Sequence, residues 1–289
     1  VWFRRIPGTS RWRGTGLLLS SSGRVTSSLA LSPTKKLRTG RSVWSDTAHP
    51  PLKVHALRGS FKADIAIVGA GISGAFMAEA LSRHYEKIVV LDRREPALGS
   101  THGSTAMLQY EIDTPRHQLA GRSGFAKAAR AWRRSFRATQ DLIALVRDEN
   151  IRCGLDPRSA LYLAGDAMGA RGMAQECRAR RRAGLECELL PGKVLAARYG
   201  IDRTAALLSG GAAVADPVAL ARGLLRRARS RGTRIFAPAD VCDVLATRHG
   251  VVLDVGGMFV EARHAVFCSG YEMLKQVPRK GVRITSSWA

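Results

Sequence analysis

Two short apolar runs flank a helical pattern in the N-terminal half of the chain. Ile65–Val68 and Ile88–Leu91 have the length and the β-branched content of buried parallel strands. Between them, Ala75, Ala78 and Leu81 recur at the spacing of one helix face. The pattern therefore predicts a strand–helix–strand unit in which the helix connects two parallel strands.

Glycines at the first turn of this unit indicate a bound dinucleotide. Gly69 allows a tight turn, Gly71 leaves the backbone open to a pyrophosphate, and Gly74 lets the helix and the strand pack closely. The helix N-terminus offers amide N–H groups and a positive dipole end to the phosphates. Asp92 ends the second strand, where a carboxylate can accept hydrogen bonds from a ribose. We therefore predict a dinucleotide-binding βαβ unit; the alternative is a glycine-rich turn in another α/β domain.

A second run of small and hydroxyl residues follows the acidic strand end. Gly99–Leu108 reads GSTHGSTAML, and its hydroxyl and backbone N–H groups suit hydrogen bonds to a phosphate or to the edge of a ring. Ser104 or Thr105 is also placed to cap a helix that runs into Met107–Tyr110. An ordinary polar loop before a capped helix is the alternative interpretation.

The remaining apolar patterns predict both helices and short strands. Phe125–Asn150 predicts a long amphipathic helix, with Trp132 and Phe136 on its apolar face and arginines on its polar face. Asp216, followed by Pro217, is expected to cap a helix over 218–231. A helix is also expected at 168–183, a strand end and a helix within 188–199, and strands at 161–164, 233–236, 241–245, 251–255, 258–260 and 265–268.

The chain is strongly basic, with 46 Lys and Arg against 23 Asp and Glu among 289 residues. Such a charge is compatible with nucleic-acid binding. No zinc finger, RNA-recognition motif or basic strand interleaved with aromatic residues supports that function, so solvated, arginine-rich helix faces are the preferred interpretation. No specific nucleic-acid partner is expected; a basic nucleic-acid-binding protein with a vestigial nucleotide fold stays as an alternative.

Hydropathy and cysteine usage restrict the cellular environment. No window reaches the roughly 18 apolar residues that a membrane span requires, so no transmembrane segment is expected. The cysteines are odd in number and form no C-x-x-C pair, which favours a reducing, cytoplasmic environment over a disulfide framework. Neither pattern indicates a metal site or an oligomeric state. The five cysteines are Cys153, Cys177, Cys187, Cys242 and Cys268.

The motifs around both strands resemble those of a known family. GAGISGAFMAEAL followed by VVLDRREPALGSTHGSTAML is similar to the FAD-dependent oxidoreductases of the D-amino-acid oxidase, glycine oxidase and sarcosine oxidase family, and the resemblance runs from about Ser42 to the end of the chain. It implies FAD as the cofactor, with Arg93 and Arg94 beside the adenosine. Without it, two arginines after the acid would suit the 2′-phosphate of NADP, so an NAD(P)-dependent dehydrogenase is the alternative.

The resemblance also implies an activity and further site residues. The activity is oxidation of a C–N bond in an amino acid or secondary amine, with a hydride passing from the substrate carbon to the flavin. A strand at Val241 would pass the adenine. Some relatives attach FAD covalently through a histidine near this turn; His102 is displaced from that position by one residue and is expected to be an ordinary loop residue. No catalytic residue is assigned. The residues expected at the cofactor are Gly69, Gly71, Ile72, Ser73, Gly74, Asp92, Arg93, Arg94, Ser100, Thr101, Ser104, Thr105, Ala106, Met107, Val241, Ser269 and Gly270.

The expected fold class is α/β, a Rossmann-like FAD-binding domain with a parallel central sheet plus an incomplete inserted α+β substrate domain. Residues 1–41 are expected to be a disordered basic tail, either the artefact of a mis-set coding start or a targeting segment. Residues 42–289 are expected to form the oxidoreductase domain, with cofactor parts at about 62–110 and 216–275 and the insertion at about 111–215. Because the resembled family continues with further segments, the chain is expected to be incomplete at its C-terminus; an inactive fragment is a further alternative.

Overall fold

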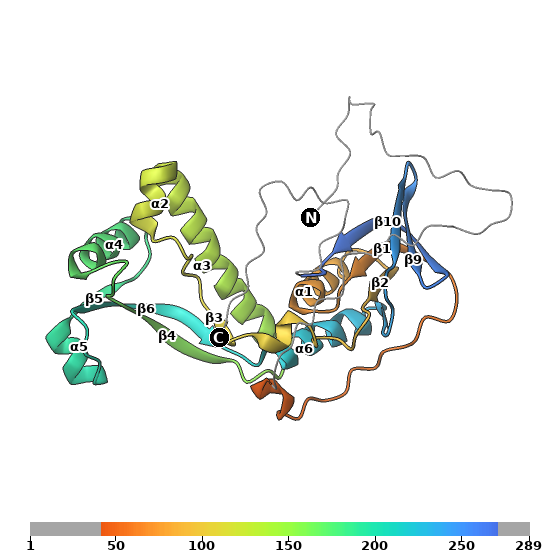
Figure 1. Cartoon of the computed structure of the whole chain (residues 1–289), viewed down its shortest axis with the longest axis horizontal. Helices are drawn as coiled ribbons and strands as arrows, with labels where there is room; N and C mark the ends of the chain where they lie inside the picture. The colour runs from red at the N-terminus through yellow and green to blue at the C-terminus, as the bar shows by residue number, and fades with distance from the viewer. Residues whose placement is uncertain (1–41, 271–289) are drawn as a thin grey trace. The chain divides into compact units, whose positions relative to one another are not determined.

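The computed structural model describes residues 42–270, and Figure 1 shows the arrangement of their helices and strands. The described residues divide into two compact units, one made of residues 42–103 and 221–270, the other of Ser104–Leu220. The predicted tail at 1–41 and the chain after Gly270 lie outside the described residues. The proposed domain boundaries stay a prediction.

The first unit is built on a six-stranded sheet with the strand order β7-β2-β1-β10-β9-β8. Its four strands from β7 to β10 run parallel, and β9 and β8 continue the sheet as antiparallel neighbours of β10. The predicted α/β class with a parallel central sheet is therefore confirmed, with an antiparallel hairpin at one edge. The strands are β1 (Phe61–Val68), β2 (Ile88–Leu91), β7 (Arg234–Phe236), β8 (Asp243–Thr247), β9 (Gly250–Val255) and β10 (Met258–Phe267).

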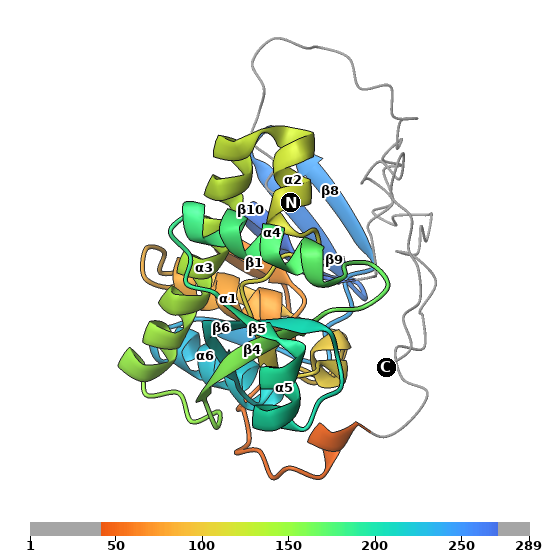
Figure 2. The ribbon, with the colours of Figure 1, turned by 90° about the vertical axis from the view of Figure 1, so that its left-hand side faces the viewer.

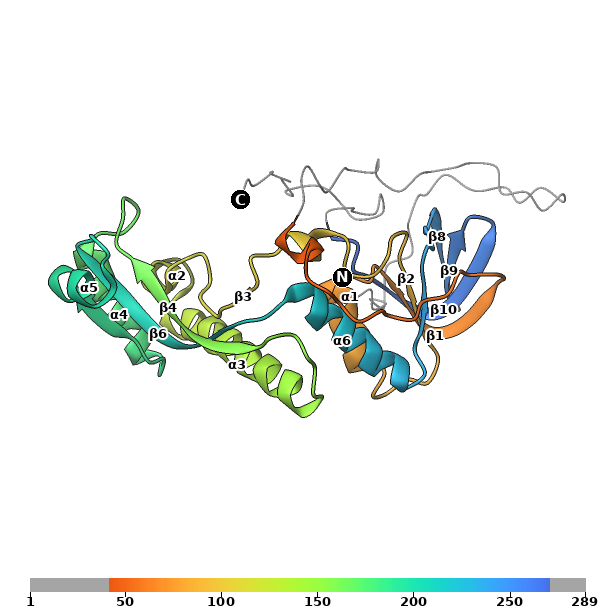
Figure 3. The ribbon, with the colours of Figure 1, turned by 90° about the horizontal axis from the view of Figure 1, so that it is seen from below.

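Different parts of the first unit pack against the two faces of this sheet. Ala66 and Val68 of β1 belong to a core cluster with Leu253 and Val260 from the antiparallel part of the sheet. Because side chains alternate along a strand, Ile65 and Ile67 point to the opposite face, where α1 (Ile72–Leu81) packs. The helix α6 (Pro217–Ser230) runs beside α1, and Arg231 at its end donates a hydrogen bond to Glu79 of α1 over 3.1 Å (Figures 1 and 3).

The close approach of α1 to the end of β1 depends on Gly74. A Cβ atom at this position would lie 1.8 Å from the carbonyl oxygen of Gly69, so either the helix or the turn must move. We expect Gly74→Ala to lower the free energy of unfolding by about 2 kcal/mol, as an overpacked core does. Urea unfolding measures the effect. Gly59→Ala is the matched control, because nothing lies within 4 Å of a Cβ there, and equal stability of the two variants would contradict the prediction.

The residues before β1 run along the first unit and are attached to it at several points. The hydroxyl of Ser42 donates to the carbonyl oxygen of His102, and Nη2 of Arg226 donates to the carbonyl oxygen of Pro50 over 2.7 Å. His55 forms a parallel bridge with Phe236 at the outer edge of β7. This segment, which includes the short 3-10 helix η1 (Val43–Ser45), therefore covers the β7 edge of the sheet.

The second unit is an α+β structure around a four-stranded antiparallel sheet. Its helices α4 and α5 lie on opposite faces of that sheet (Figure 2): Met173 of α4 packs against Leu207, and Leu195 of α5 packs with Ala206. The strands are β3 (Met107–Leu108), β4 (Asp156–Leu163), β5 (Glu188–Pro191) and β6 (Ala205–Val214), and the helices are α2 (Arg116–Ser123), α3 (Phe125–Asp148), α4 (Ala170–Arg182) and α5 (Gly192–Tyr199).

The prediction of a capped helix running into Met107–Tyr110 is wrong. Met107–Leu108 forms the strand β3, because Met107 lies opposite Val214 and the two strands satisfy each other's backbone groups. The hydroxyl of Ser104 accepts a hydrogen bond from the amide of Ala106, which is a local turn rather than a helix cap. The separate strands predicted at 258–260 and 265–268 are also wrong as two elements, since β10 runs unbroken from Met258 to Phe267 along β1.

Two elements were not predicted at all. The Gly210-Gly211 pair interrupts the apolar run of β6, although β4 pairs along its length. The helix α2 has almost no apolar periodicity, and the carboxylate of Glu176 in α4 accepts hydrogen bonds from its first two amides, Arg116 and His117. The predicted cap of α6 is confirmed, because Oδ1 of Asp216 accepts hydrogen bonds from two amides of the first turn.

Candidate cofactor site

Three segments of the first unit converge at the turn that follows β1. Gly69 has a φ of +104°, and a Cβ atom there would lie 2.5 Å from the carbonyl oxygen of Cys268. The hydroxyl of Thr101, in the 3-10 helix η2 (Ser100–Gly103), accepts a hydrogen bond from the amide of Ile72 over 2.9 Å. A Cβ atom at Gly270 would lie 3.7 Å from the hydroxyl of Ser100. The predicted residues at 69–74, 100–101 and 269–270 are therefore neighbours in space.

The N-terminus of α1 forms the floor of this site. Gly71 is its N-cap and provides no side chain, and the first turn contains no acidic residue. The amides of Ser73 and Gly74 lie in the first turn, where no helical carbonyl precedes them, and the helix dipole adds partial positive charge there. Among the described residues outside the helix's own backbone, the hydroxyl of Thr101 is the one neighbour within 4 Å of a Cβ built on Gly71, at 3.1 Å. An anionic group can therefore approach these amides closely.

Asp92 is held rigidly beside the same turn. Its Oδ2 accepts a hydrogen bond from the amide of Ala70 over 2.7 Å, and its Oδ1 accepts one from the amide of Arg94 over 2.9 Å. Its backbone is fixed between β7 and the next loop, by the carbonyl of Phe236 and the amide of Ala239. Each carboxylate oxygen has two lone pairs, so this arrangement can still accept hydrogen bonds from a sugar hydroxyl.

The thiol of Cys268 adds no negative charge to the turn. Burial raises the pKa of Cys268, so the side chain is a neutral thiol at pH 7. Its amide donates to the carbonyl of Val68, which joins the ends of β10 and β1 at the site. The thiol therefore does not oppose the α1 dipole at the turn.

The chain matches the family described as FAD dependent oxidoreductase, of the D-amino-acid oxidase type, over residues 64–287. It belongs to this family. No curated protein sequence matches the chain.

Several solved structures have a similar fold. Glycine oxidase from Geobacillus kaustophilus is 22% identical with a TM-score of 0.59, and the match covers 73% of this chain and 56% of that one. L-Amino acid deaminase from Proteus myxofaciens, in complex with anthranilate, is 14% identical with a TM-score of 0.60, covering 77% and 48%. L-α-Glycerophosphate oxidase from Mycoplasma pneumoniae, with FAD bound, is 16% identical with a TM-score of 0.56, covering 71% and 53%. At these identities the similarity concerns the fold, and the chain spans about half the length of these structures.

FAD is the cofactor of this family, and the turn after β1 fits its diphosphate. The space before Gly71 would be filled by any larger side chain, and the α1 amides behind it are suited to phosphate oxygens. Asp92 lies at the strand end where the family places the ribose acceptor. The individual residue roles remain proposals, but the described residues of the first unit suit the group.

The other predicted residues divide between the two units. Arg93 and Arg94 follow Asp92, and Nη2 of Arg94 lies 3.6 Å from the Cβ position of Gly99. Val241 is buried, at 3% exposure, in the core cluster of the first unit. Ser104, Thr105, Ala106 and Met107 belong to the second unit, and their role at the cofactor stays a prediction.

Three residues near the site differ from the expectation or were missed: His102, Ala70 and Ser42. His102 is not an ordinary loop residue: it lies in η2 and is only 5% exposed. Its carbonyl oxygen accepts a hydrogen bond from the Ser42 hydroxyl. Ala70, the unnamed residue of the glycine motif, provides the amide that fixes Asp92. The glycine motif itself points to Ala70, because this residue lies between Gly69 and Gly71 in the turn that follows β1. Ser42 has no such signal, because it lies sixty positions from its partner.

We expect Asp92→Asn to weaken FAD binding by about 2 kcal/mol, roughly thirtyfold, because a hydrogen bond to a charged acceptor is lost. Titration of the purified protein with FAD, followed by flavin fluorescence, measures the change. Asp64→Asn, in β1 and before the turn, is the matched control; its carboxylate accepts a long 3.4 Å hydrogen bond from the amide of Lys87 and lies 3.6 Å from Nε of Arg263. Equal affinity of the two variants would contradict the role of Asp92.

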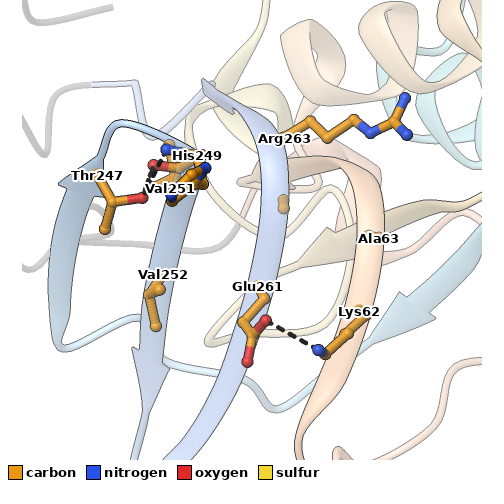
Figure 4. Close-up of a pocket in the computed structure, with 10 residues that line it drawn as sticks. Lys62, Ala63, Thr247, His249, Val251, Val252, Glu261 and Arg263 are labelled. Carbon is orange, nitrogen blue, oxygen red and sulfur yellow. Dashed lines mark hydrogen bonds and ion pairs between the residues drawn. The ribbon is translucent and has the colours of Figure 1, made fainter.

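A shallow trough lies at the other end of β1 and β10, away from the turn. Figure 4 shows Lys62 and Glu261 facing each other across it, joined by an ion pair of 3.3 Å. Both side chains are largely exposed, at 83% and 55%, so the pair is solvated and the trough has no enclosed polar group. Among the described residues no cluster of three or more His, Cys, Asp or Glu is arranged to bind a metal ion, and none of the described helices is long and apolar enough to cross a membrane.

Proposed function

We propose that this chain provides the FAD-binding part of an oxidoreductase that oxidises a C–N bond of an amino acid or a secondary amine. The supporting observation is the turn at Gly69–Gly74 with Asp92 fixed beside it, in a chain that belongs to the FAD-dependent family. Glycine oxidase and L-amino acid deaminase are among the similar folds, and both names denote action on amino acids. The substrate proposed is therefore a small amine or amino acid.

FAD, when bound, supplies the electron sink that accepts a hydride from the substrate carbon. The residues of this chain bind and orient it. The α1 amides hold the diphosphate, Asp92 orients the ribose, and the neutral thiol of Cys268 leaves the anionic group unopposed. An NAD(P)-dependent dehydrogenase would use the same turn, so the cofactor itself is the first test.

The experiment is to purify the full chain and measure its absorbance, with and without added FAD, NAD⁺ and NADP⁺. The proposal expects the flavin bands to be retained after gel filtration and neither nicotinamide to bind in competition. Retention of NAD⁺ or NADP⁺ without any flavin would contradict it. Bound FAD should then be bleached anaerobically by glycine, sarcosine or L-proline.

A separate result would contradict the proposed substrate class. One similar fold is named L-α-glycerophosphate oxidase, which acts on a C–O bond rather than a C–N bond. Bleaching of the bound flavin by glycerol 3-phosphate, with no response to the three amines, would contradict the C–N assignment while leaving the FAD assignment in place.

We also propose a reducing, cytoplasmic location and no specific nucleic-acid partner. All five cysteines are free thiols, and Cys153, Cys177 and Cys187 are buried. Burial raises the pKa of Cys187 to about 12, with the neighbouring Cys177 adding to the effect, so this thiol is unreactive. Cell fractionation with thiol labelling tests the location.

A further inference from the structure

A line of positive charge runs along one face of α3, and we call it the α3 basic stripe. It consists of Lys127, Arg130, Arg133, Arg134 and Arg137, all exposed. At 3.6 residues per turn these positions fall within about 120° of the helix circumference and extend over about 15 Å. No Asp or Glu occurs between Thr114 and Gln140. The core residues of α3, including Trp132 and Ile143, occupy the opposite face.

The fold itself makes little use of this charge. Lys127, Arg130 and Arg134 have no hydrogen bond or ion pair to any described residue, and Arg133 reaches only the carbonyl of Ala183 at 3.5 Å. Arg137 approaches Asp141 at 3.8 Å, and both are exposed. The stripe is therefore not required for packing of the described chain.

The arginines near α6 behave differently, which makes them an internal comparison. Arg222 pairs with Glu95 at 3.8 Å, Arg226 donates to the carbonyl of Pro50 over 2.7 Å, and Arg231 donates to Glu79 over 3.1 Å. Arginines can therefore find partners within this fold, even in an arginine-rich chain. The α3 basic stripe is distinguished by its alignment and by its lack of partners.

An aromatic and cationic cluster lies at the beginning of α3, on the side of the helix that carries Trp132 rather than on the stripe. The ring of Phe125 is 43% exposed and is approached by two guanidinium groups, Arg116 at 4.2 Å and Arg182 at 4.9 Å. Arg116 is only 1% exposed, and its Nε and Nη2 have no hydrogen-bond acceptor in the part of the chain that the structure describes.

The stripe is also bounded. Asp141 and Asp148 follow on the same helix face, at about 100° per residue, and both are exposed. A long polyanion that followed the helix axis would pass over these carboxylates and be repelled. A short anionic segment of about three helical turns would not.

From this arrangement we propose that the α3 basic stripe binds an acidic segment of a partner protein. Guanidinium groups at i, i+3, i+4 and i+7 match carboxylates at the same spacing on a helix lying alongside, and each pair can be bidentate. Arginine is enriched in protein interfaces. This partner is independent of the proposed flavin chemistry.

The experiment uses the full chain and a labelled helical peptide of about three turns with glutamates at i, i+3, i+4 and i+7. Binding is followed by fluorescence anisotropy at low and at physiological salt. We expect the double variant Arg130→Glu, Arg134→Glu to bind about tenfold or more weakly, because two attractions become repulsions. The control, Arg198→Glu with Arg203→Glu, makes the same change in net charge at exposed positions of the same unit and should bind as the unaltered chain does.

Two further probes are measured in parallel: duplex DNA and vesicles of phosphatidylcholine with phosphatidylglycerol. If either binds more tightly than the peptide and loses its binding in the stripe variant, the partner is not an acidic protein and the proposal is wrong. Equal losses in the stripe variant and in the control would also overturn it, since general charge would then explain the binding. Unchanged flavin content and unchanged melting temperature exclude misfolding of either variant.

Discussion

Replacing Gly71 with valine should weaken FAD binding about a thousandfold, roughly 4 kcal/mol, while leaving the first unit folded. Among the described residues outside the helix's own backbone, a Cβ at this position meets the hydroxyl of Thr101 at 3.1 Å, so the Thr101 side chain must shift slightly, while the extended backbone of Gly71 accepts a valine without strain. Its methyl groups would occupy the space in front of the α1 N-terminus. The diphosphate would then lose its hydrogen bonds to the helix amides, each worth about 1.5–3 kcal/mol to a charged acceptor.

Two measurements distinguish this loss from unfolding. FAD titration gives the affinity, and urea unfolding without added flavin gives the stability. Gly59→Ala serves as the control, because its Cβ meets nothing within 4 Å and lies away from the turn. If the valine variant takes up flavin as the control does, the turn at Gly69–Gly74 does not hold the diphosphate, and the proposed function fails with it.

The second large effect is expected at Glu176, in the second unit. This carboxylate is fully buried, and it accepts hydrogen bonds from the amides of Arg116 and His117 and from the side chains of His117 and Arg180. Glu176→Ala should destabilise the unit by about 3–5 kcal/mol, because buried Arg180 would keep only the more distant carboxylate of Glu111, at 3.6 Å, and the first two amides of α2 would lose their acceptor. Urea unfolding, with hydrogen exchange of the α2 and α4 amides, reports on this unit by itself.

The same carboxylate predicts a pH dependence. Burial alone would raise the pKa of Glu176, but the hydrogen bonds from His117, Arg180 and Arg116 outweigh it and lower the pKa below its ordinary value. The stabilisation is therefore complete above the unfolded pKa of about 4.3 and is lost as the pH falls through the lower, folded pKa. Glu176→Gln should lose this dependence. Glu186→Gln, at an exposed position, is the control, and an equal acid response in both variants would contradict the assignment.

Much of the cofactor unit could be predicted because its signals are local. The glycines of the turn, the strands before and after it, and Asp92 all lie within one short stretch, where steric rules link residue type to backbone shape. The α6 cap could also be predicted, because Asp216 and the amides it accepts are adjacent along the chain. In the second unit only the long, strongly periodic helix α3 was similarly clear.

The sequence by itself therefore determined the βαβ unit, its glycine turn and its acidic strand end, since each depends on neighbours along the chain. Only the tertiary structure decided that Met107–Leu108 is a strand, that α2 forms at all, and that Ser42 supports the loop of His102. These elements are stabilised by hydrogen-bond partners far away in sequence, so no local pattern encodes them. The same holds for the α3 basic stripe. Its charges can be read from the sequence, but only the fold shows how few partners they have among the described residues.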